Sequence, residues 1–355
     1  MALQSCSLSD LLAMDKTYAS KIRIRREVIL NNEKDVVDCN PVAKEAVAEL
    51  YEWIFGTYLP KRFPNAFVIS EAPEISPSDK ASESAVKDGH LRNITTNELI
   101  PLASPASPIE ALKTLGRHVD AEFALLLPTP DAAASLPRVQ PTSAPPHPYH
   151  LHAWVLCFPS GFTTASKHGL ALAAIHAPVP GYGAKLARSM DRFFAALPFA
   201  AVVRRQNWAV QSGERLFRLA GNHLSTVADE EGGEKREVRM APPEYRERPE
   251  MREEWERLRE EVDPSECRLR AERQTLHRLE KTGALVFAFK TYLYTLDEVI
   301  EEGLAEQMAD AVEGLGKGGV PAIEVYKRAV VWSKKVVKYL RAGHQKREAL
   351  RQKVE

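Results

Sequence analysis

The fold is decided by two strand-like segments and the turn between them, residues 267–279 (CRLRAERQTLHRL), 280–283 (EKTG) and 284–294 (ALVFAFKTYLY). β-Branched and aromatic residues favour strands, and a short connection that contains glycine is typical of a hairpin. The sequence therefore predicts two long, paired antiparallel strands. Side chains alternate between the faces of a strand. The first strand thus carries polar residues on both faces, which an ordinary core strand does not.

Other elements follow from hydrophobic periodicity. Strands are predicted at residues 66–69, 121–127, 150–158, 201–211 and 216–219. Helices are predicted as two short pieces within 8–30, broken near Asp15, and at residues 41–59, 108–117, 186–197, 250–262, 295–312 and 321–341. Polar loops are expected at 71–95 and 229–250. The sum predicts an α+β fold, an antiparallel sheet of five or more strands flanked by helices, with additional helices at both ends.

We expect residues 1–355 to form a single domain with two additions. Residues 128–148 are rich in proline, alanine and serine, which predicts disorder or a long surface insertion. Residues 295–355 form a helical C-terminal extension.

The helix predicted after residue 40 has clear signals at both ends. Asn40 suits an N-cap, Pro41 suits the first helical position, and we expect Pro60 to end the helix. The apolar face of this helix consists of Val42, Ala46, Val47, Leu50, Tyr51, Ile54, Phe55 and Tyr58.

The second helical piece near the N-terminus is basic. Its cationic residues are Lys21, Arg23, Arg25 and Arg26. Such residues could attract acidic groups, but a solvated helix face is the interpretation that we favour.

Composition excludes several classes of function. The 355 residues carry 48 basic and 48 acidic side chains, so nothing favours nucleic acid or an anionic membrane as the main partner. No apolar run approaches the ~18 residues of a membrane helix, and the N-terminus has no basic region typical of a secretory signal. The four cysteines are widely scattered, without the spacing of a zinc or iron–sulfur site or of a disulfide framework. We therefore expect a cytoplasmic protein.

One histidine lies between an apolar run and a rigid turn, in residues 175–182 (IHAPVPGY). Pro178 and Pro180 restrict the backbone beside His176, and Gly181 permits a tight turn. A metal-binding histidine keeps one ring nitrogen free while the other is hydrogen-bonded, often in apolar surroundings. His176 is a candidate ligand on these grounds, although a histidine in an apolar stretch is more often a structural residue. Its surroundings would come from Ile175, Ala177, Val179 and Tyr182.

Two adjacent arginines, Arg204 and Arg205, lie within an otherwise apolar predicted strand. Alternation places Arg204 and Trp208 on one face and Arg205 and Asn207 on the other. Burial of an unpaired arginine is costly, so at least one should pair with an acid or face a ligand. An ion pair that holds the sheet and a ligand-binding role both remain open.

The same reasoning applies to the strand at residues 267–279. Glu272, Gln274 and Arg278 alternate with Arg273 and His277. Arg273 or Gln274 could donate a hydrogen bond to a small anion or to oxygen. An ion pair between Glu272 and a neighbouring arginine is the competing explanation.

These motifs, taken in order, resemble a known family. The ordered set consists of residues 158–162 (FPSGF), 167–169 (KHG), 175–182 (IHAPVPGY), 205–208 (RQNW) and 270–279 (RAERQTLHRL). It is similar to the haem-dependent oxidative N-demethylase-like family, formerly a domain of unknown function with many fungal members. The Pro-rich insertion and Glu280, where a proline is expected, depart from the pattern.

The resemblance implies a PAS-like haem-binding fold and oxidation of a small secondary amine such as dimethylamine. Haem b would be the bound cofactor, and FMN, 2Fe-2S and NADPH would act only through partner proteins, as a separate electron-transfer reductase. His176 becomes the expected axial ligand of the iron. Other residues expected at the cofactor are Tyr182, Arg204 and Arg278. Residues expected to polarise oxygen or hold the amine are Arg205, Asn207, Arg273 and Gln274.

Two alternatives remain at this level. The chain could be a PAS-like haem or small-ligand sensor without turnover, because a fold does not fix a function. It could also be a haem-free interaction protein that docks through its Pro-rich insertion.

Overall fold

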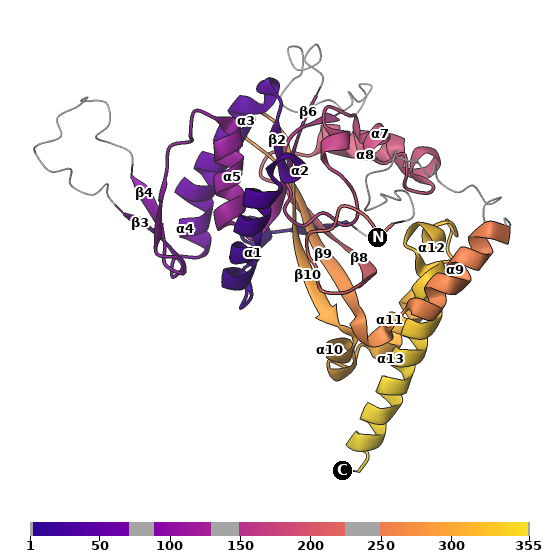
Figure 1. The fold of residues 1–355 in the computed structure, drawn as a ribbon. Coiled ribbons are helices and arrows are strands. Elements are labelled where there is room, and N and C mark those ends of the chain that lie inside the picture. Colours follow the sequence, from indigo (N-terminus) through magenta and orange to yellow (C-terminus); the bar gives the residue numbers. More distant parts are fainter. Residues whose placement is uncertain (1–2, 71–88, 129–148, 224–248, 354–355) are drawn as a thin grey trace, which may run out of the picture.

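A seven-stranded sheet forms the centre of the computed structural model, which describes residues 3–70, 89–128, 149–223 and 249–353 (Figure 1). The strand order is β1-β8-β9-β10-β6-β7-β2, and each of these pairings is antiparallel. The strands are β1 (Gln4–Cys6), β2 (Val37–Cys39), β6 (Glu122–Pro128), β7 (Tyr149–Val155), β8 (Val202–Ser212), β9 (Cys267–Arg278) and β10 (Leu285–Thr295). The predicted fold class, an antiparallel sheet flanked by helices, is confirmed.

The predicted hairpin is the longest part of this sheet. β9 and β10 pair continuously from Arg278 with Leu285 to Arg268 with Thr295. Gly283 has a φ of +69°, a conformation that glycine adopts without strain, and it completes the turn between the strands. β8 pairs with the other edge of β9 from Val203 to Ser212, so the two arginine-bearing strands are neighbours.

A second, three-stranded sheet contains β3 (Phe67–Ser70), β4 (His90–Asn93) and β5 (Glu98–Pro101). β4 lies inside the segment predicted as a loop at 71–95, of which residues 71–88 are outside the described residues. The strand predicted at 216–219 is wrong. Among the described residues, the β-pairing of this segment is limited to an isolated bridge between Arg218 and Ser160. Of the predicted insertion at 128–148, only Pro128 is described, at the end of β6.

Helices cover both faces of the main sheet and extend from one end of it (Figure 1). Their bounds are α1 (Tyr18–Asn31), α2 (Glu33–Val36), α3 (Lys44–Trp53), α4 (Leu59–Arg62), α5 (Pro108–His118), α7 (Leu172–Ile175), α8 (Ala187–Ala196), α9 (Pro249–Glu261), α10 (Leu296–Glu301), α11 (Ala305–Glu313), α12 (Ile323–Tyr326) and α13 (Ala329–Arg351).

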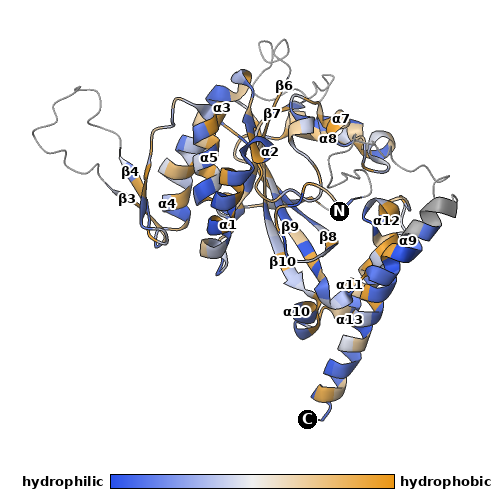
Figure 2. Ribbon diagram, viewed as in Figure 1, coloured by the Kyte–Doolittle hydropathy of each residue, from blue (hydrophilic) through white to orange (hydrophobic). Residues whose placement is uncertain are grey.

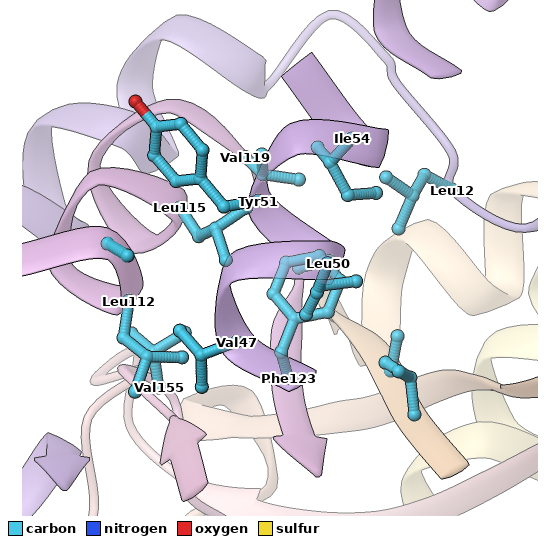
Figure 3. Close-up of a cluster of buried hydrophobic side chains, with 14 of the residues drawn as sticks. Leu12, Val47, Leu50, Tyr51, Ile54, Leu112, Leu115, Val119, Phe123 and Val155 are labelled. Atoms are coloured by element: carbon cyan, nitrogen blue, oxygen red, sulfur yellow. The ribbon is translucent and has the colours of Figure 1, made fainter. Parts of the chain in front are cut away.

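Alternation along the strands builds a core on each face of the sheet. On β6, Phe123 and Leu125 point into the core beneath α1, α3 and α5, as Figure 3 shows for Phe123 beside Leu50 and Val47. Ala124 and Leu126 point the other way, into a core with Leu172 of α7 and Phe194 of α8. The two-residue period of the strand thus separates the N-terminal helices from α7 and α8.

The C-terminal helices form a third core around the end of β8 and β9. Val210 and Cys267 from the sheet pack with Leu296, Val299, Met308, Ala309, Val312, Trp332, Val336 and Leu340. Helices were predicted at 295–312 and 321–341, but each of these segments is divided. Gly303, with a φ of +81°, separates α10 from α11, and Arg328, with a φ of +55°, separates α12 from α13. A residue with positive φ cannot continue a right-handed helix.

The prediction that Pro60 ends the helix that follows residue 40 is wrong. The segment begins with a 3₁₀ turn, Pro41–Ala43, continues as α3, and passes through a π-helical turn, Ile54–Tyr58, into α4. A proline inside an α-helix lacks an N–H and collides with the carbonyl four residues earlier. The π-helical turn changes the hydrogen-bond register before Pro60, so the helix continues to Arg62.

The favoured interpretation of the basic helix is also wrong for two of its residues. Lys21 and Arg25 on α1 are buried, and both turn toward acids at the start of β6. Arg25 pairs with Glu122, and Lys21 lies 3.8 Å from Asp120. Arg23 is exposed, as the solvated interpretation requires.

His277 contributes to the pH dependence of stability. The side chain is buried on β9, neither ring nitrogen has a hydrogen-bond partner among the described residues, and burial lowers its pKa to about 4. Below the ordinary pKa of 6.5, the unfolded chain binds a proton that the folded chain excludes, so stability falls as the pH falls from 6.5 toward 4. We expect His277→Leu to make this decline shallower in urea unfolding at a series of pH values. An unchanged slope would contradict this role.

Candidate functional site

His176 has a fixed ring tautomer. It follows α7 directly, and its Nδ1 lies 2.8 Å from the Leu172 carbonyl oxygen, which can only accept a hydrogen bond. Nδ1 therefore carries the proton, and Nε2 keeps its lone pair. Burial lowers the pKa of His176 to about 4, with smaller effects from Lys167 and Arg205 in the same direction. The ring is consequently neutral near pH 7, which is the form that binds a metal.

The ring of Tyr182 stacks on one face of the His176 ring. The two rings stack with their centroids 4.6 Å apart and an interplanar angle of 12°. Tyr182 is 3 % exposed, and within the described chain its hydroxyl is buried without a hydrogen-bond partner. Burial raises the pKa of Tyr182, and Arg205 acts on it in the opposite direction.

The turn between these two rings is held by the C-terminal part of the chain. Gly181 has a φ of +74°, and a β-carbon there would lie 2.9 Å from Val320. Lys185 donates a hydrogen bond to the Gly319 carbonyl over 2.6 Å. Glycine is therefore required twice at position 181, by the backbone conformation and by the close approach of Val320.

A row of polar side chains on β8 and β9 lies on the face of the sheet that packs against α7, and Arg205 of this row acts electrostatically on His176 and Tyr182. The register pairs Arg205 with Gln274 and Asn207 with Glu272, so all four side chains share one face. Arg205 Nε donates to Gln274 Oε1 (2.5 Å), and Gln274 Nε2 donates to Glu272 Oε2 (2.9 Å). Asn207 Nδ2 also donates to Glu272 Oε2, over 3.4 Å. Figure 2 shows these hydrophilic stretches on β8 and β9.

Arg270 extends this row toward Phe158, which lies at the end of the segment after β7. Its Nε lies 3.6 Å from Glu272 Oε1, and its Nη2 donates to the Phe158 carbonyl over 2.7 Å. Arg270 is 1 % exposed, so Glu272 is its buried counter-ion. The predicted ion pair between Glu272 and a neighbouring arginine is therefore present. Glu272 takes part both in this ion pair and in the polar row.

A second histidine and two lysines adjoin the row. The rings of His223 and Tyr326 are 4.5 Å apart, and burial lowers the pKa of His223 to about 3, with further lowering by Lys327 and Lys167. Lys327 Nζ lies 3.5 Å from Asn207 Oδ1 and also contacts the Trp208 carbonyl. Lys167 Nζ lies 4.0 Å from the ring centroid of Phe162.

Five of these residues were not predicted at the site, although two of them belong to conspicuous motifs. Lys167 belongs to the KHG motif, and Glu272 belongs to the motif on β9. Nothing in the local sequence marks His223, Tyr326 or Lys327, because long-range packing alone brings them to the sheet.

Three of the predicted site residues lie apart from His176. Arg204 and Arg273 project from the opposite face of the sheet, where Arg204 Nε donates to Gln4 Oε1 and Arg273 donates to the Asp10 and Leu11 carbonyls. Arg278 binds the Phe194 and Leu197 carbonyls at the end of α8. Such contacts satisfy helix C-terminal carbonyls and are structural. The predicted roles of these three arginines stay predictions.

No helix within the described residues is both long and apolar enough to span a lipid bilayer. Comparison with curated proteins finds no match. A family profile described as "Haem-dependent oxidative N-demethylase, alpha subunit-like" matches residues 2–337, and this range includes each of the residues around His176. The chain therefore belongs to the haem-dependent oxidative N-demethylase alpha subunit-like family.

Proposed function

We propose that this chain is the haem-binding oxygenase component of an oxidative N-demethylase that acts on a small secondary amine such as dimethylamine. The observation that carries the proposal is the geometry of His176. A neutral imidazole whose Nδ1–H is bonded to a backbone carbonyl presents Nε2 as a ligand, and the partner of the other nitrogen fixes the ring orientation.

The residues around His176 fit a haem. Leu172 and Ile175, on the segment that leads to His176, belong to the apolar core of α7 and α8. The buried Tyr182 hydroxyl lacks a partner in the described structure, as expected where a bound group is needed to complete the site. His176 would hold the iron, Tyr182 would fix the plane of the imidazole ring, and Arg205 would lie on the polar side.

A bound haem supplies the redox centre at which dioxygen is reduced, with electrons from a separate reductase. Haem b as the cofactor type, and FMN, 2Fe-2S and NADPH on partner proteins, are parts of the same proposal. We also propose a PAS-like relationship for the sheet and its helices.

The chain's own contribution is to bind and orient the amine. A secondary amine is protonated at neutral pH and needs an anion, and Glu272 is the carboxylate of the polar row. The donors of Gln274 and Asn207 hold its Oε2, and the Arg205 bond to Gln274 Oε1 fixes which end of that amide faces Glu272. Preorganised donors of this kind stabilise a charge without reorganisation during the reaction.

The test is formaldehyde release from dimethylamine by haem-loaded protein with a supplied electron donor. Loss of one N-methyl group by oxidation gives one formaldehyde for each amine consumed. Haem uptake without formaldehyde from dimethylamine or other small secondary amines would indicate the sensor alternative. Absence of haem uptake by folded protein would contradict both functions.

Glu272→Gln should raise the KM for dimethylamine by about tenfold or more, because one charge-assisted hydrogen bond to the substrate is lost. The substitution keeps the shape of the side chain, and the matched control is Glu280→Gln in the exposed hairpin turn. Steady-state formaldehyde assays on both variants provide the measurement. An equal KM in the two variants would show that Glu272 does not hold the amine.

A further inference from the structure

The His176 side of the sheet carries several cations, among them the half-buried Lys167, Lys327 and Arg205. Among the described residues, no carboxylate lies within ion-pairing distance of any of these three. Glu272 is the carboxylate that raises the pKa of Lys327 and of Arg205 electrostatically, but it forms its ion pair with Arg270.

Each lysine ammonium has only neutral neighbours in the described structure. Lys167 Nζ contacts the Phe162 ring, and Lys327 Nζ contacts a carbonyl, an amide oxygen and, at 5.2 Å, the Trp208 ring. Burial lowers the pKa of both lysines to about 8, so each is still mostly protonated at pH 7. Removing an ammonium from water without an anion costs several kcal/mol, on the order of the Born penalty after relaxation.

Lys167 lies in the KHG motif and Lys327 lies beyond the last motif, so long-range folding brings both lysines near His223. Both act electrostatically on His223, and Lys167 also acts on His176. The segment that carries Lys327 follows Val320, which contacts Gly181 in the motif turn. Positive charge without a carboxylate partner in the described structure therefore acts on both histidines, from Lys167 on His176 and from both lysines on His223.

We propose that Lys167 and Lys327 form an anion-binding site for the two propionate carboxylates of the haem that His176 holds. The inference rests on the proposed function and assigns the orientation of the cofactor: the carboxylate edge faces His223 and Tyr326, and the apolar edge faces α7 and α8. Lysine is a suitable residue because it binds an oxyanion as a compact point charge with three donors. Residues 319–327, from the predicted C-terminal extension, would then be part of the cofactor site.

The experiment compares haemin with haemin dimethyl ester, in which both carboxylates are blocked. Apo-protein is titrated with each compound, and absorbance at the Soret band gives the dissociation constant. Wild type should bind haemin about a hundredfold more tightly than the ester, the equivalent of two charge-assisted contacts. Lys167→Met and Lys327→Met should each weaken haemin binding about tenfold and leave ester binding unchanged.

Two further variants separate charge from packing. Lys167→Arg keeps the cation and should retain the preference for haemin over its ester. Lys317→Met removes an exposed lysine from the same C-terminal segment and should bind both compounds as wild type does. Far-ultraviolet circular dichroism checks that each variant is folded.

The outcomes distinguish this inference from the proposed function. Equal affinity of wild type for the two compounds, or Met variants that weaken both compounds alike, would overturn the propionate site and leave haem binding intact. Failure of folded wild type to bind either compound would overturn the proposed function and the propionate site together.

Discussion

Replacing Arg25 by alanine should lower the free energy of unfolding by about 3–5 kcal/mol, the usual cost of breaking a buried ion pair from one side. Arg25 is 0 % exposed and Glu122 is 1 % exposed, so neither charge can turn toward water when its partner is lost. Arg25 also donates to the Gly116 and Ala121 carbonyls, each over 2.8 Å. The substitution therefore leaves one carboxylate and two carbonyls without their donor.

Urea unfolding of Arg25→Ala provides the measurement, with Arg23→Ala as the control. Arg23 is on the same helix but exposed, and surface substitutions usually change stability by less than about 0.5 kcal/mol. The double variant Arg25→Met, Glu122→Leu should be less destabilised than Arg25→Ala, because it removes both charges and keeps the core filled. Equal stability of Arg25→Ala and Arg23→Ala would contradict the burial described for α1.

The sequence is a good guide to the sheet because local patterns define strands. The alternation of Gln274 with Arg273, and of Arg205 with Arg204, correctly predicts which of these side chains share a face. It cannot tell which face adjoins His176, since both faces carry polar residues. That choice depends on where α7 and the C-terminal helices pack, which involves contacts between residues far apart in the chain.

The same limit explains the errors on the helices. A cationic helix face suggests solvent exposure, and only the position of Asp120 and Glu122, just before and at the start of β6, explains why Arg25 and Lys21 are buried. Pro60 is a strong local stop signal, but the π-helical turn before it removes the conflict. Tertiary packing overrides local preference in both cases.

The candidate site shows a similar division. The IHAPVPGY motif identifies His176 and Tyr182, and their stacking follows from the short turn between them. Lys327 lies 151 positions beyond His176 in the numbering and reaches the polar row through its contacts with Asn207 and Trp208 of β8. No pattern of spacing could have found it.

His176→Ala should abolish tight haem binding while the fold persists. The variant removes the Nε2 lone pair that the hydrogen bond to Leu172 makes available. Loss of a residue that only supports a ligand already costs about 10–100-fold in metal affinity, so loss of the ligand itself should cost at least about 100-fold. His344→Ala on α13 is the matched control and should bind haem as wild type does.

The most direct test of the account is therefore the absorbance titration of wild type, His176→Ala and His344→Ala with haemin, followed by addition of imidazole. The account predicts one haem per chain and a Soret band in wild type and His344→Ala. In His176→Ala it predicts loss of this band and at least partial recovery when imidazole supplies the missing ligand. A folded His176→Ala protein that binds haemin with the affinity and Soret band of wild type would show that another residue holds the iron.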